Sequence, residues 1–422
     1  MRSINPPTAT AKNFDSPHSL LGPILGVIAL TSMISFPRSF AAIKLFLIAL
    51  FIAVNILNSF TIDRHQRTIA MLPVAVFYVV VALLGTIWIF IGASNGAHEG
   101  AASDYFRLYV VWSAAYFLLL IALRQFDAAQ IFHRSIVISG IIIALVNFIG
   151  LYDYYSGARI IPSWMYDELE LRVGFHEGYT QVTSHNIGFL LFIGGYLIAW
   201  HCRAMKQRSF FRIESISLIL TIAIIIFSGR RAIWIAVSVT PIIILVLSAL
   251  TQTFSQNRNF GKMVIVGILI AALIGATTPF DLILQFIYSA FSSEDERTIQ
   301  SAYLIDGFVN YPYFGSGLGV DAGYLRSDNF PWLYELTYHQ LFYNFGTFGV
   351  LIILVTAFLY IRKAADIIAT PKFYRSGFFE LLVGFFIFCI GTYSNPYFGS
   401  FDFLLVIAIL PFIASYDPIK ER

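Results

Sequence analysis

Long apolar runs divide this chain into segments of membrane length, and no other feature constrains its fold as strongly. Hydrophobic residues make up 58% of the sequence and charged residues only 12%, a composition that excludes a soluble globular domain. A helix needs about 20 mostly apolar residues to cross the hydrocarbon core of a bilayer. Twelve segments approach this length, and they lie at 20–36, 40–60, 69–92, 106–123, 135–151, 186–201, 213–228, 231–251, 262–277, 340–361, 376–394 and 397–415.

The sequence therefore predicts an all-α integral membrane protein with about 12 transmembrane helices. A single polytopic membrane domain spans 20–415, between an N-terminal tail at 1–19 and a C-terminal tail at 416–422. The N-terminal tail is polar and leads into the first apolar run without an obvious small-residue cleavage site. We expect it to act as a signal anchor that the mature protein retains.

The positively charged residues indicate the orientation of these helices. Of the 27 Lys and Arg residues, 18 fall on the termini and on every second loop, and this bias marks the cytoplasmic side. Both termini are therefore predicted to be cytoplasmic. The other nine lie toward the opposite side, and eight of them are Arg. Because Arg presents a planar fork of donors that matches phosphate oxygens, we expect an anionic, phosphorylated ligand at the outer surface.

Two long loops lie on the predicted outer side, at about 152–185 and about 278–339. Loops of this length are usually functional or disordered. The later loop is the longest polar stretch of the chain and also contains many aromatic residues, so we expect it to be ordered, partly helical and to lie on the membrane surface. Its run from Gly315 to Gly319 lacks the Lys-Ser/Thr pair of a phosphate-binding loop and is interpreted as a structural turn.

Arginines near the outer ends of the helices are the first candidates for binding the anion. Arg230 and Arg231 are adjacent in a tight connection between two spans. A charge at the interface is costly and marks a function by default; the alternative is a pair of interfacial anchors. Arg297 follows three acidic residues, so it either forms local ion pairs in a solvated turn or binds phosphate across a cavity from Arg231. Arg172 and Arg326, in the two long loops, are further candidates for contacting the same ligand.

Two histidines lie at the outer boundaries of spans and are candidates for acid–base chemistry. His339 stands where the later loop enters the tenth span, and an imidazole that titrates near neutral pH can accept a proton from a hydroxyl group. Glu335, one helical turn earlier, is a candidate for orienting its ring. His185 has a similar position at the mouth of the sixth span. For each histidine, the alternative is an interfacial residue that is hydrogen-bonded to the backbone.

Other classes of site find little support in the sequence. The acidic groups at 167–170 and 294–296 each have an Arg close by and lack a compact Asp-x-Asp pattern, so we expect no metal ion and no cofactor. The net charge of +3 is too small to imply nucleic acid as a partner. A transporter would have charged residues along many spans, whereas here they gather at one face, with Lys44, Glu380 and Asp402 as exceptions.

Taken together, these features resemble the O-antigen ligase/O-antigen polymerase superfamily of bacterial polysaccharide assembly. The resemblance covers the whole topology and three local elements. Arg231, followed by the small residue Ala232, is similar to a Ser-Arg-small element of the family, although Arg230 stands in the place of the Ser. Arg297 matches a second family arginine, which opens the long loop ahead of a Gly-rich turn. His339, before a helix with paired glycines, resembles the catalytic histidine of the family.

The resemblance implies a glycosyltransferase that works at the periplasmic face of the bacterial inner membrane. Its donor would be a glycan linked through diphosphate to undecaprenol. Arg231 and Arg297 would bind the diphosphate, and His339 would deprotonate the acceptor hydroxyl group. The transfer would need no metal and would invert the configuration at the anomeric carbon. The other residues expected to contact the diphosphate or the sugar are Arg230, Arg326, His185, Arg172 and Glu335.

Polymerase and ligase share this chemistry and differ in their acceptor. A polymerase transfers the chain to another lipid-linked repeat unit of O-antigen or exopolysaccharide, and a ligase transfers it to lipid A-core. Two sizeable outer loops, and Gln340 after His339 where ligases commonly have Asn, favour the polymerase. The expected partners are the lipid-linked donor, a glycan or lipid A-core acceptor, the lipid bilayer and a chain-length regulator. The hypothesis from another class is a polysaccharide flippase.

Overall fold

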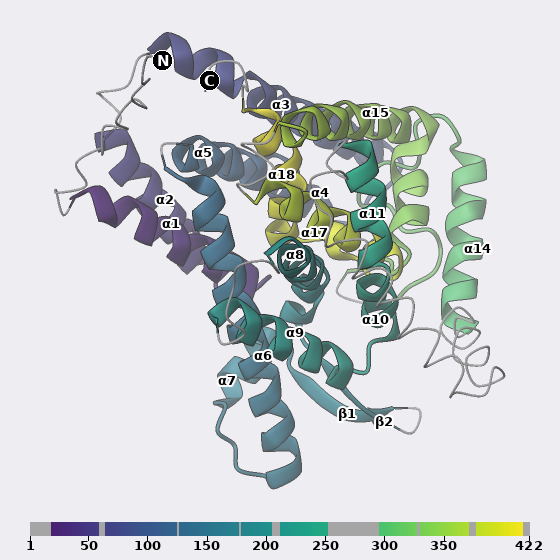
Figure 1. Cartoon of the computed structure of the whole chain (residues 1–422). Coiled ribbons are helices and arrows are strands. Elements are labelled where there is room, and N and C mark those ends of the chain that lie inside the picture. The colour runs from purple at the N-terminus through teal and green to yellow at the C-terminus, as the bar shows by residue number, and fades with distance from the viewer. Residues whose placement is uncertain are drawn as a thin grey trace, which may run out of the picture.

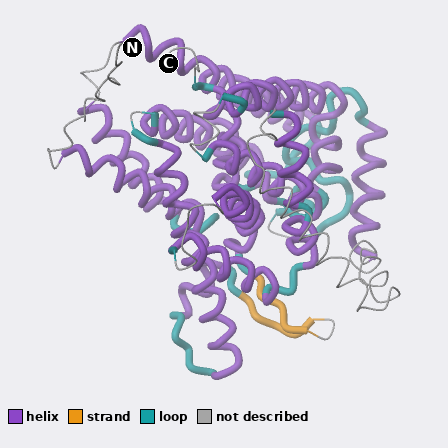
Figure 2. The backbone as a smooth tube through the Cα atoms, in the orientation of Figure 1, coloured by secondary structure: helices purple, strands orange, loops and turns teal. Residues whose placement is uncertain are grey.

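Figure 1 shows a computed structural model of the chain, which describes residues 18–58, 64–124, 126–176, 179–204, 212–251, 295–326, 330–370 and 377–416. Within these residues the chain is mostly helical, and strand is confined to one short two-stranded sheet (Figure 2). The predicted helical fold class is therefore confirmed for the described part of the chain.

The described helices follow one another in the order of the predicted spans. In chain order they are α1 (His18–Ser35), α2 (Ala41–Asn58), α3 (Arg64–Ser94), α4 (Ala101–Phe106), the π-helix η2 (Arg107–Trp112), α5 (Ser113–Leu123), α6 (Ala128–Ser156), α7 (Ser163–Leu169), the 3-10 turn η3 (His185–Gly188), α8 (Phe189–Ala204), α9 (Ile213–Phe227), α10 (Arg231–Ser238), α11 (Thr240–Leu250), α14 (Asp295–Asn310), α15 (Thr337–Ile368), α17 (Phe378–Gly391), the 3-10 turns η5 (Thr392–Ser394), η6 (Tyr397–Gly399) and η7 (Phe401–Phe403), and α18 (Leu404–Ala414). A helix covers each predicted span except 262–277, which lies outside the described residues.

Several of these helices have the length and composition of membrane spans. Five are long and apolar enough to cross a membrane, namely Met71–Ser94, Ala101–Leu123, Ala128–Ser156, Ala232–Leu250 and Thr337–Ile368. Large apolar side chains are exposed along α3 and α15, including Leu83, Phe90, Leu354 and Phe358. Contiguous apolar surface of this kind is stable against lipid rather than against water. The helices are those of a membrane protein, while the total of twelve spans stays a prediction.

The centre of the bundle is formed by α8 and α17, whose side chains are almost all buried (Figure 1). Glycines allow the two helices to approach closely. A Cβ atom added at Gly384 would lie 2.8 Å from the backbone oxygen of Phe192, and one added at Gly195 would lie 2.9 Å from Ile387 Cγ1. Small residues at helix interfaces are typical of membrane bundles, where close packing takes the place of the hydrophobic effect. Helices α6, α9, α10 and α11 contact α8 around this centre.

The first long loop, at 152–185, contains a short β-hairpin that was not among the predicted elements. After α6 and α7, strand β1 (Arg172–His176) pairs antiparallel with β2 (Tyr179–Thr183). These strands form where β-branched and aromatic residues alternate with others, which favours extended backbone. The backbone N–H of Val182 donates a hydrogen bond to the Ser228 carbonyl oxygen at 3.2 Å. The hairpin is therefore attached to the connection between α9 and α10.

The described part of the segment 278–339 contains helix α14, and its glycine run fits into a break in α15. The break lies at Gly346, whose φ of 60° and ψ of −173° are not helical. The backbone N–H groups of Ser316 and Gly317 donate to the carbonyl oxygens of Tyr343 (2.8 Å) and Asn344 (3.0 Å). These are carbonyl groups that the interrupted helix would otherwise leave without partners. The predicted structural turn is confirmed, and it separates the short first part of α15 from its long apolar part.

Two polar contacts join connections that the cation pattern assigns to the same predicted end of the bundle. At the predicted outer end, Ser39 Oγ donates a hydrogen bond to the Glu168 carbonyl oxygen at 2.6 Å. At the predicted inner end, Arg203 Nη2 lies 2.6 Å from Glu380 Oε1. The first contact joins two loops that were assigned to one side from their cations, and the second joins two helix ends assigned to the other. The alternation of sides that the cations indicate stays a prediction.

Candidate functional site

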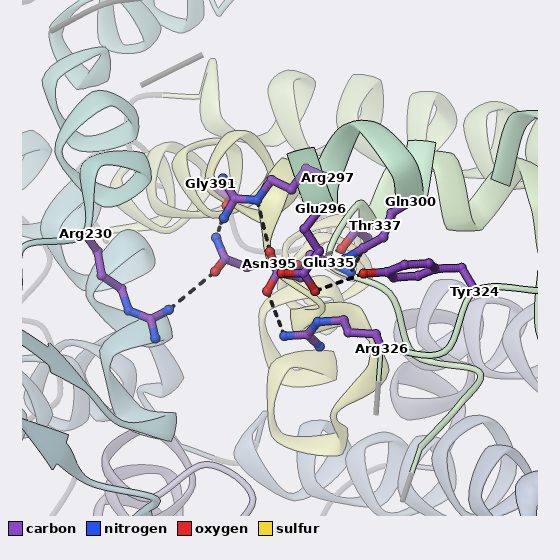
Figure 3. Close-up of polar contacts among 10 residues, drawn as sticks. All are labelled: Arg230, Glu296, Arg297, Gln300, Tyr324, Arg326, Glu335, Thr337, Gly391 and Asn395. Carbon is purple, nitrogen blue, oxygen red and sulfur yellow. Dashed lines mark hydrogen bonds and ion pairs between the residues drawn. The ribbon is translucent and has the colours of Figure 1, made fainter. Parts of the chain in front are cut away.

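Arg297 and Arg326 converge on one carboxylate in the region where the outer connections meet (Figure 3). Arg297 extends from the first turn of α14, and its Nε lies 3.0 Å from Glu335 Oε2. Arg326 extends from the following loop, and its Nη2 lies 2.7 Å from Glu335 Oε1. The backbone N–H of Glu335 also donates to Gln300 Oε1 at 3.2 Å. Both carboxylate oxygens are therefore engaged by guanidinium groups, the geometry in which charge-assisted hydrogen bonds are strong.

These contacts pair Arg297 with a distant carboxylate rather than with its local neighbours, while its binding of phosphate stays a prediction. Its neighbour Glu296 accepts a hydrogen bond from the Tyr324 hydroxyl group at 3.3 Å, whereas Arg297 reaches a carboxylate 38 residues away. The described contacts therefore favour long-range pairing across the site. The side chain of Arg297 is 35% exposed, that of Arg326 is 30% exposed and that of Glu335 is 25% exposed, so the group is open to a ligand from the solvent.

Arg230 reaches the same region from the opposite side. It immediately precedes α10, and its Nη1 lies 3.5 Å from Asn395 Oδ1, a long contact (Figure 3). The Nε of Arg230 is buried without a hydrogen-bond partner among the described residues. The Asn395 carbonyl oxygen accepts a hydrogen bond from Thr337 Oγ1 at 2.6 Å. Thr337 lies two residues after Glu335, so this bond joins Asn395 to the segment that carries the carboxylate group. Arg231 is the first residue of α10, and its side chain lies outside the described part of the structure.

His339 lies in the first turn of α15, beside a small apolar pocket. This pocket has a volume of about 250 Å³ and is lined by Leu304, Ile305, Phe308, Tyr338, His339 and Phe342. The Nδ1 of His339 is buried without a hydrogen-bond partner among the described residues. Glu335, which the sequence suggests as the orienting group, instead binds the two arginines. The reason is geometric, because Glu335 precedes the helix and its side chain faces α14.

A larger apolar cavity adjoins the histidine pocket. Its volume is about 430 Å³, and it lies between α3, α5, α15, α17 and α18. Tyr338 and Phe342 line both spaces. The other walls are almost entirely aliphatic and aromatic, with Leu84, Phe117 and Phe386 among them. An apolar chain would be held there by burial alone, since polar groups are scarce on the walls.

The two remaining predicted residues of the first long loop have different surroundings. The Nε2 of His185 lies 2.8 Å from Glu170 Oε2, and the His185 side chain is 17% exposed. Burial lowers the pKa of His185 below its ordinary value, and the nearby charge of Arg38 adds to this effect. Arg172 lies at the start of β1 with an exposed side chain. The hairpin holds it, and the described contacts do not join it to Glu335.

A buried ion pair beneath the outer connections was not among the predicted site residues. Lys44 Nζ lies 2.9 Å from Asp402 Oδ1, and the two side chains are 1% and 0% exposed. The other oxygen, Asp402 Oδ2, accepts a hydrogen bond from the backbone N–H of Arg38 at 2.5 Å. Two opposite charges inside apolar helices are a sequence signal for such a pair. That signal identifies Lys44 and Asp402, but it does not predict the contact between Arg38 and Asp402.

In the part of the chain that the structure describes, no group of three or more His, Cys, Asp and Glu side chains is arranged to hold a metal ion.

Comparisons with known proteins add nothing to this geometry. No protein-family model, no curated protein and no solved structure matches this chain.

Proposed function

We propose that this protein transfers a glycan from an undecaprenyl-diphosphate-linked donor to a sugar hydroxyl group, at the periplasmic face of the bacterial inner membrane. The observation that supports this most is an exposed arginine group in the same region as an apolar cavity. Arg297 and Arg326 hold one carboxylate between them, and α15, which begins two residues after it, lines the 430 Å³ cavity. A ligand with an anionic head and a long apolar chain matches both features.

In this proposal the arginines bind the phosphates of the donor. When the glycosidic bond breaks, its electron pair passes to the diphosphate, and negative charge increases on the phosphate oxygens. Arg297 and the Arg230–Arg231 pair would stabilise that charge, and removing one such donor typically costs about 2.7–4 kcal/mol of transition-state stabilisation. A glycan would then leave its carrier without a metal ion.

The acceptor hydroxyl group requires a base, and His339 is the proposed base. Its Nδ1 is buried and makes no hydrogen bond to the described residues, so a substrate hydroxyl group would be its first partner. The hydroxyl oxygen would attack the anomeric carbon on the face opposite the diphosphate, and the proton would pass to the imidazole. This in-line attack inverts the anomeric configuration. The apolar side chains around His339 exclude water that would otherwise compete as the acceptor.

Polymerisation of O-antigen or exopolysaccharide repeat units is the first choice, and transfer to lipid A-core is the alternative. Purified protein in liposomes, supplied with undecaprenyl-diphosphate-linked repeat units, distinguishes them. A ladder of lengthening lipid-linked glycan without lipid A-core supports a polymerase. A single product that requires lipid A-core identifies a ligase. Substrate binding without any product, under both conditions, would favour the flippase hypothesis.

Three substitutions test the proposed roles in the same assay. His339→Ala should reduce the transfer rate by about 10²–10⁴-fold, the usual contribution of a general base, while donor binding is retained. Arg297→Ala should weaken both binding and transfer. Arg107→Ala is the matched control, because Arg107 is an exposed outer-side arginine that pairs only locally with Asp104. Full activity of both His339→Ala and Arg297→Ala would refute this mechanism.

A further inference from the structure

Arg38 has an unusual backbone conformation that the surrounding structure maintains. It lies in the connection between α1 and α2 with a φ of 67°, a region that residues other than glycine rarely adopt. Its backbone N–H donates to Asp402 Oδ2 at 2.5 Å. Lys44 Nζ donates to the carbonyl oxygen of Phe36, also at 2.5 Å. Strain of this kind persists only where neighbouring contacts determine it, and it is common at ligand sites.

The contacts that hold this backbone are themselves costly. The Lys44–Asp402 pair is almost completely buried, and removing two charges from water carries a penalty that only good geometry offsets. Here both carboxylate oxygens have partners, and Lys44 Nζ also lies 5.2 Å from the centre of the Phe401 ring. The pair joins α2 to the turn before α18 and fixes the connection that contains Arg38. A costly ion pair therefore stabilises the strained backbone of one short turn.

The connection that contains Arg38 lies near the candidate site. Asp402, which binds the Arg38 backbone, follows closely after Asn395, and Asn395 contacts both Arg230 and Thr337. The Arg38 side chain is exposed, and its charge acts on Glu170 of the first long loop and on Arg326 of the second. It also acts on the phenol of Tyr397, as does the charge of Arg230. The Arg38 charge is therefore within electrostatic reach of both Arg326 and the Tyr397–Arg230 side.

We propose that Arg38 is a further anion-binding residue of the outer site, which binds a phosphate of a lipid-linked diphosphate, and that the Lys44–Asp402 pair positions it. This inference rests on the proposed function for the identity of the ligand. The planar guanidinium group can bind two phosphate oxygens at once. The fixed backbone restricts the positions that the group can reach before the ligand arrives, which would reduce the entropy lost on binding.

The test measures binding of farnesyl diphosphate to the full chain in detergent micelles, by calorimetry. Arg38→Gly removes the guanidinium group and also relieves the positive φ, so the variant should remain folded. Arg159→Gly is the matched control, because Arg159 is exposed and has a φ of 55° in another outer loop. We expect Arg38→Gly to lower the affinity at least about tenfold, as for the loss of charge-assisted hydrogen bonds, and Arg159→Gly to leave it unchanged.

Two further ligands identify the part of the molecule that Arg38 recognises. Farnesol, which lacks the phosphates, should bind the wild type and Arg38→Gly equally. Arg38→Gly should bind inorganic diphosphate more weakly than the wild type does, by a factor similar to that for farnesyl diphosphate. Equal affinity of the wild type and Arg38→Gly for farnesyl diphosphate would overturn the inference.

The positioning role has a separate readout. Asp402→Asn keeps the Arg38 guanidinium group but weakens the ion pair that fixes its backbone. We expect Asp402→Asn to lower the affinity for farnesyl diphosphate. Adding Arg38→Gly to Asp402→Asn should then reduce the affinity by a smaller factor than Arg38→Gly reduces it in the wild type. Additive losses would contradict positioning. If the wild type binds the probe through Arg38 but never transfers glycan, the proposed function fails while the anion site stands.

Discussion

Glu335 is the residue whose role the structure changes most. The sequence suggests that it orients His339, but its carboxylate lies between Arg297 and Arg326. A carboxylate that bridges two guanidinium groups has the charge and the shape of part of a phosphate group. In the proposed function, Glu335 would act as an internal anion that an incoming phosphate must displace, and until then it holds the two arginines close together and ordered.

Replacing this carboxylate should strengthen the binding of an anionic ligand. We expect Glu335→Gln to raise the affinity for farnesyl diphosphate by several-fold, because Arg297 and Arg326 would no longer be neutralised by a fixed charge. Calorimetric titration of the purified protein measures the change. Glu296→Gln is the matched control, since Glu296 is exposed and accepts its hydrogen bond from Tyr324. A lower affinity in Glu335→Gln would mean that the carboxylate mainly holds the arginines in place.

His185 predicts a dependence of stability on pH. Burial lowers its pKa from the ordinary value of 6.5, with a further lowering by Arg38 and Lys44 and an opposing effect of Glu170. The folded state therefore binds this proton less readily than the unfolded state. The contribution to stability is complete above pH 6.5 and is lost as the pH falls below that value.

The expected outcome is a lower midpoint of thermal unfolding at pH about 5 than at neutral pH, and a smaller decrease in His185→Gln. Differential scanning of the purified protein at both pH values measures it. His98→Gln provides the comparison, because His98 pairs with Asp321 in a part of the outer region that is about one-third exposed. An acid-induced decrease that is identical in wild type and His185→Gln would refute the role of His185.

At the scale of elements, close packing against helices explains why the run from Gly315 to Gly319 requires glycine. Gly317 has a φ of 88°, and a Cβ atom there would lie 2.1 Å from the backbone nitrogen of Gly92 in α3. Gly96 has a φ of 87°, but a Cβ atom there would meet nothing within 4 Å. The two positions have the same backbone conformation and differ only in packing.

This difference predicts unequal effects of the same substitution. Gly96→Ala should cost only the strain of the positive φ. Gly317→Ala should destabilise by about 1–3 kcal/mol more, because the added methyl group meets backbone that cannot move aside easily. The unfolding midpoint of each variant in one detergent measures the difference. Similar midpoints for the two variants would show that the contact between the turn and α3 is loose.

The elements were predictable to the extent that they depend on local composition. The apolar runs predicted helices wherever the structure describes those segments, because a lipid-facing helix must be apolar over its own length. The β1–β2 hairpin escaped prediction, since five-residue strands give a short pattern. Its signal was the alternation of Val173 and Phe175 on one side of the 177–178 connection and of Thr180 and Val182 on the other.

The candidate site was predictable only as a set of residue types. An outer Arg or His can be recognised from its position relative to the spans, as His339 and Arg297 were. Its partner cannot, because pairing depends on folding across long separations, 38 residues for Arg297 with Glu335 and 364 for Arg38 with Asp402. Arg38 in particular lies in the five-residue connection between α1 and α2, which is too short to show a pattern.

At the scale of the whole molecule, the two groups of contacts describe a bundle with two chemically different ends. The predicted inner end carries Arg203 paired with the buried Glu380, and the outer end carries the arginines of the candidate site. The cation bias predicts that the end with the site faces outside. This orientation is testable without any knowledge of the substrate.

We expect a membrane-impermeant thiol reagent, added to intact cells, to label Ala158→Cys but not Lys363→Cys. Both positions are exposed, and the cation pattern assigns the first to the outer side and the second to the cytoplasm. The two native cysteines, Cys202 and Cys389, are changed to Ala in both variants. Permeabilised cells serve as the control in which both positions react. Labelling of Lys363→Cys in intact cells would invert the topology.

The 430 Å³ apolar cavity also decides where selectivity must arise in a real membrane. Phospholipid acyl chains and detergent tails compete with any prenyl chain for such a space, and they greatly outnumber a carrier lipid. A hydrophobic pocket distinguishes one hydrocarbon from another only weakly, by about 1–3 kcal/mol per methylene group. If the ligand is a lipid-linked diphosphate, rejection of bulk lipid would fall to the head-group end, where a diphosphate differs from a phospholipid in charge. Affinities measured in micelles would then depend on the detergent concentration.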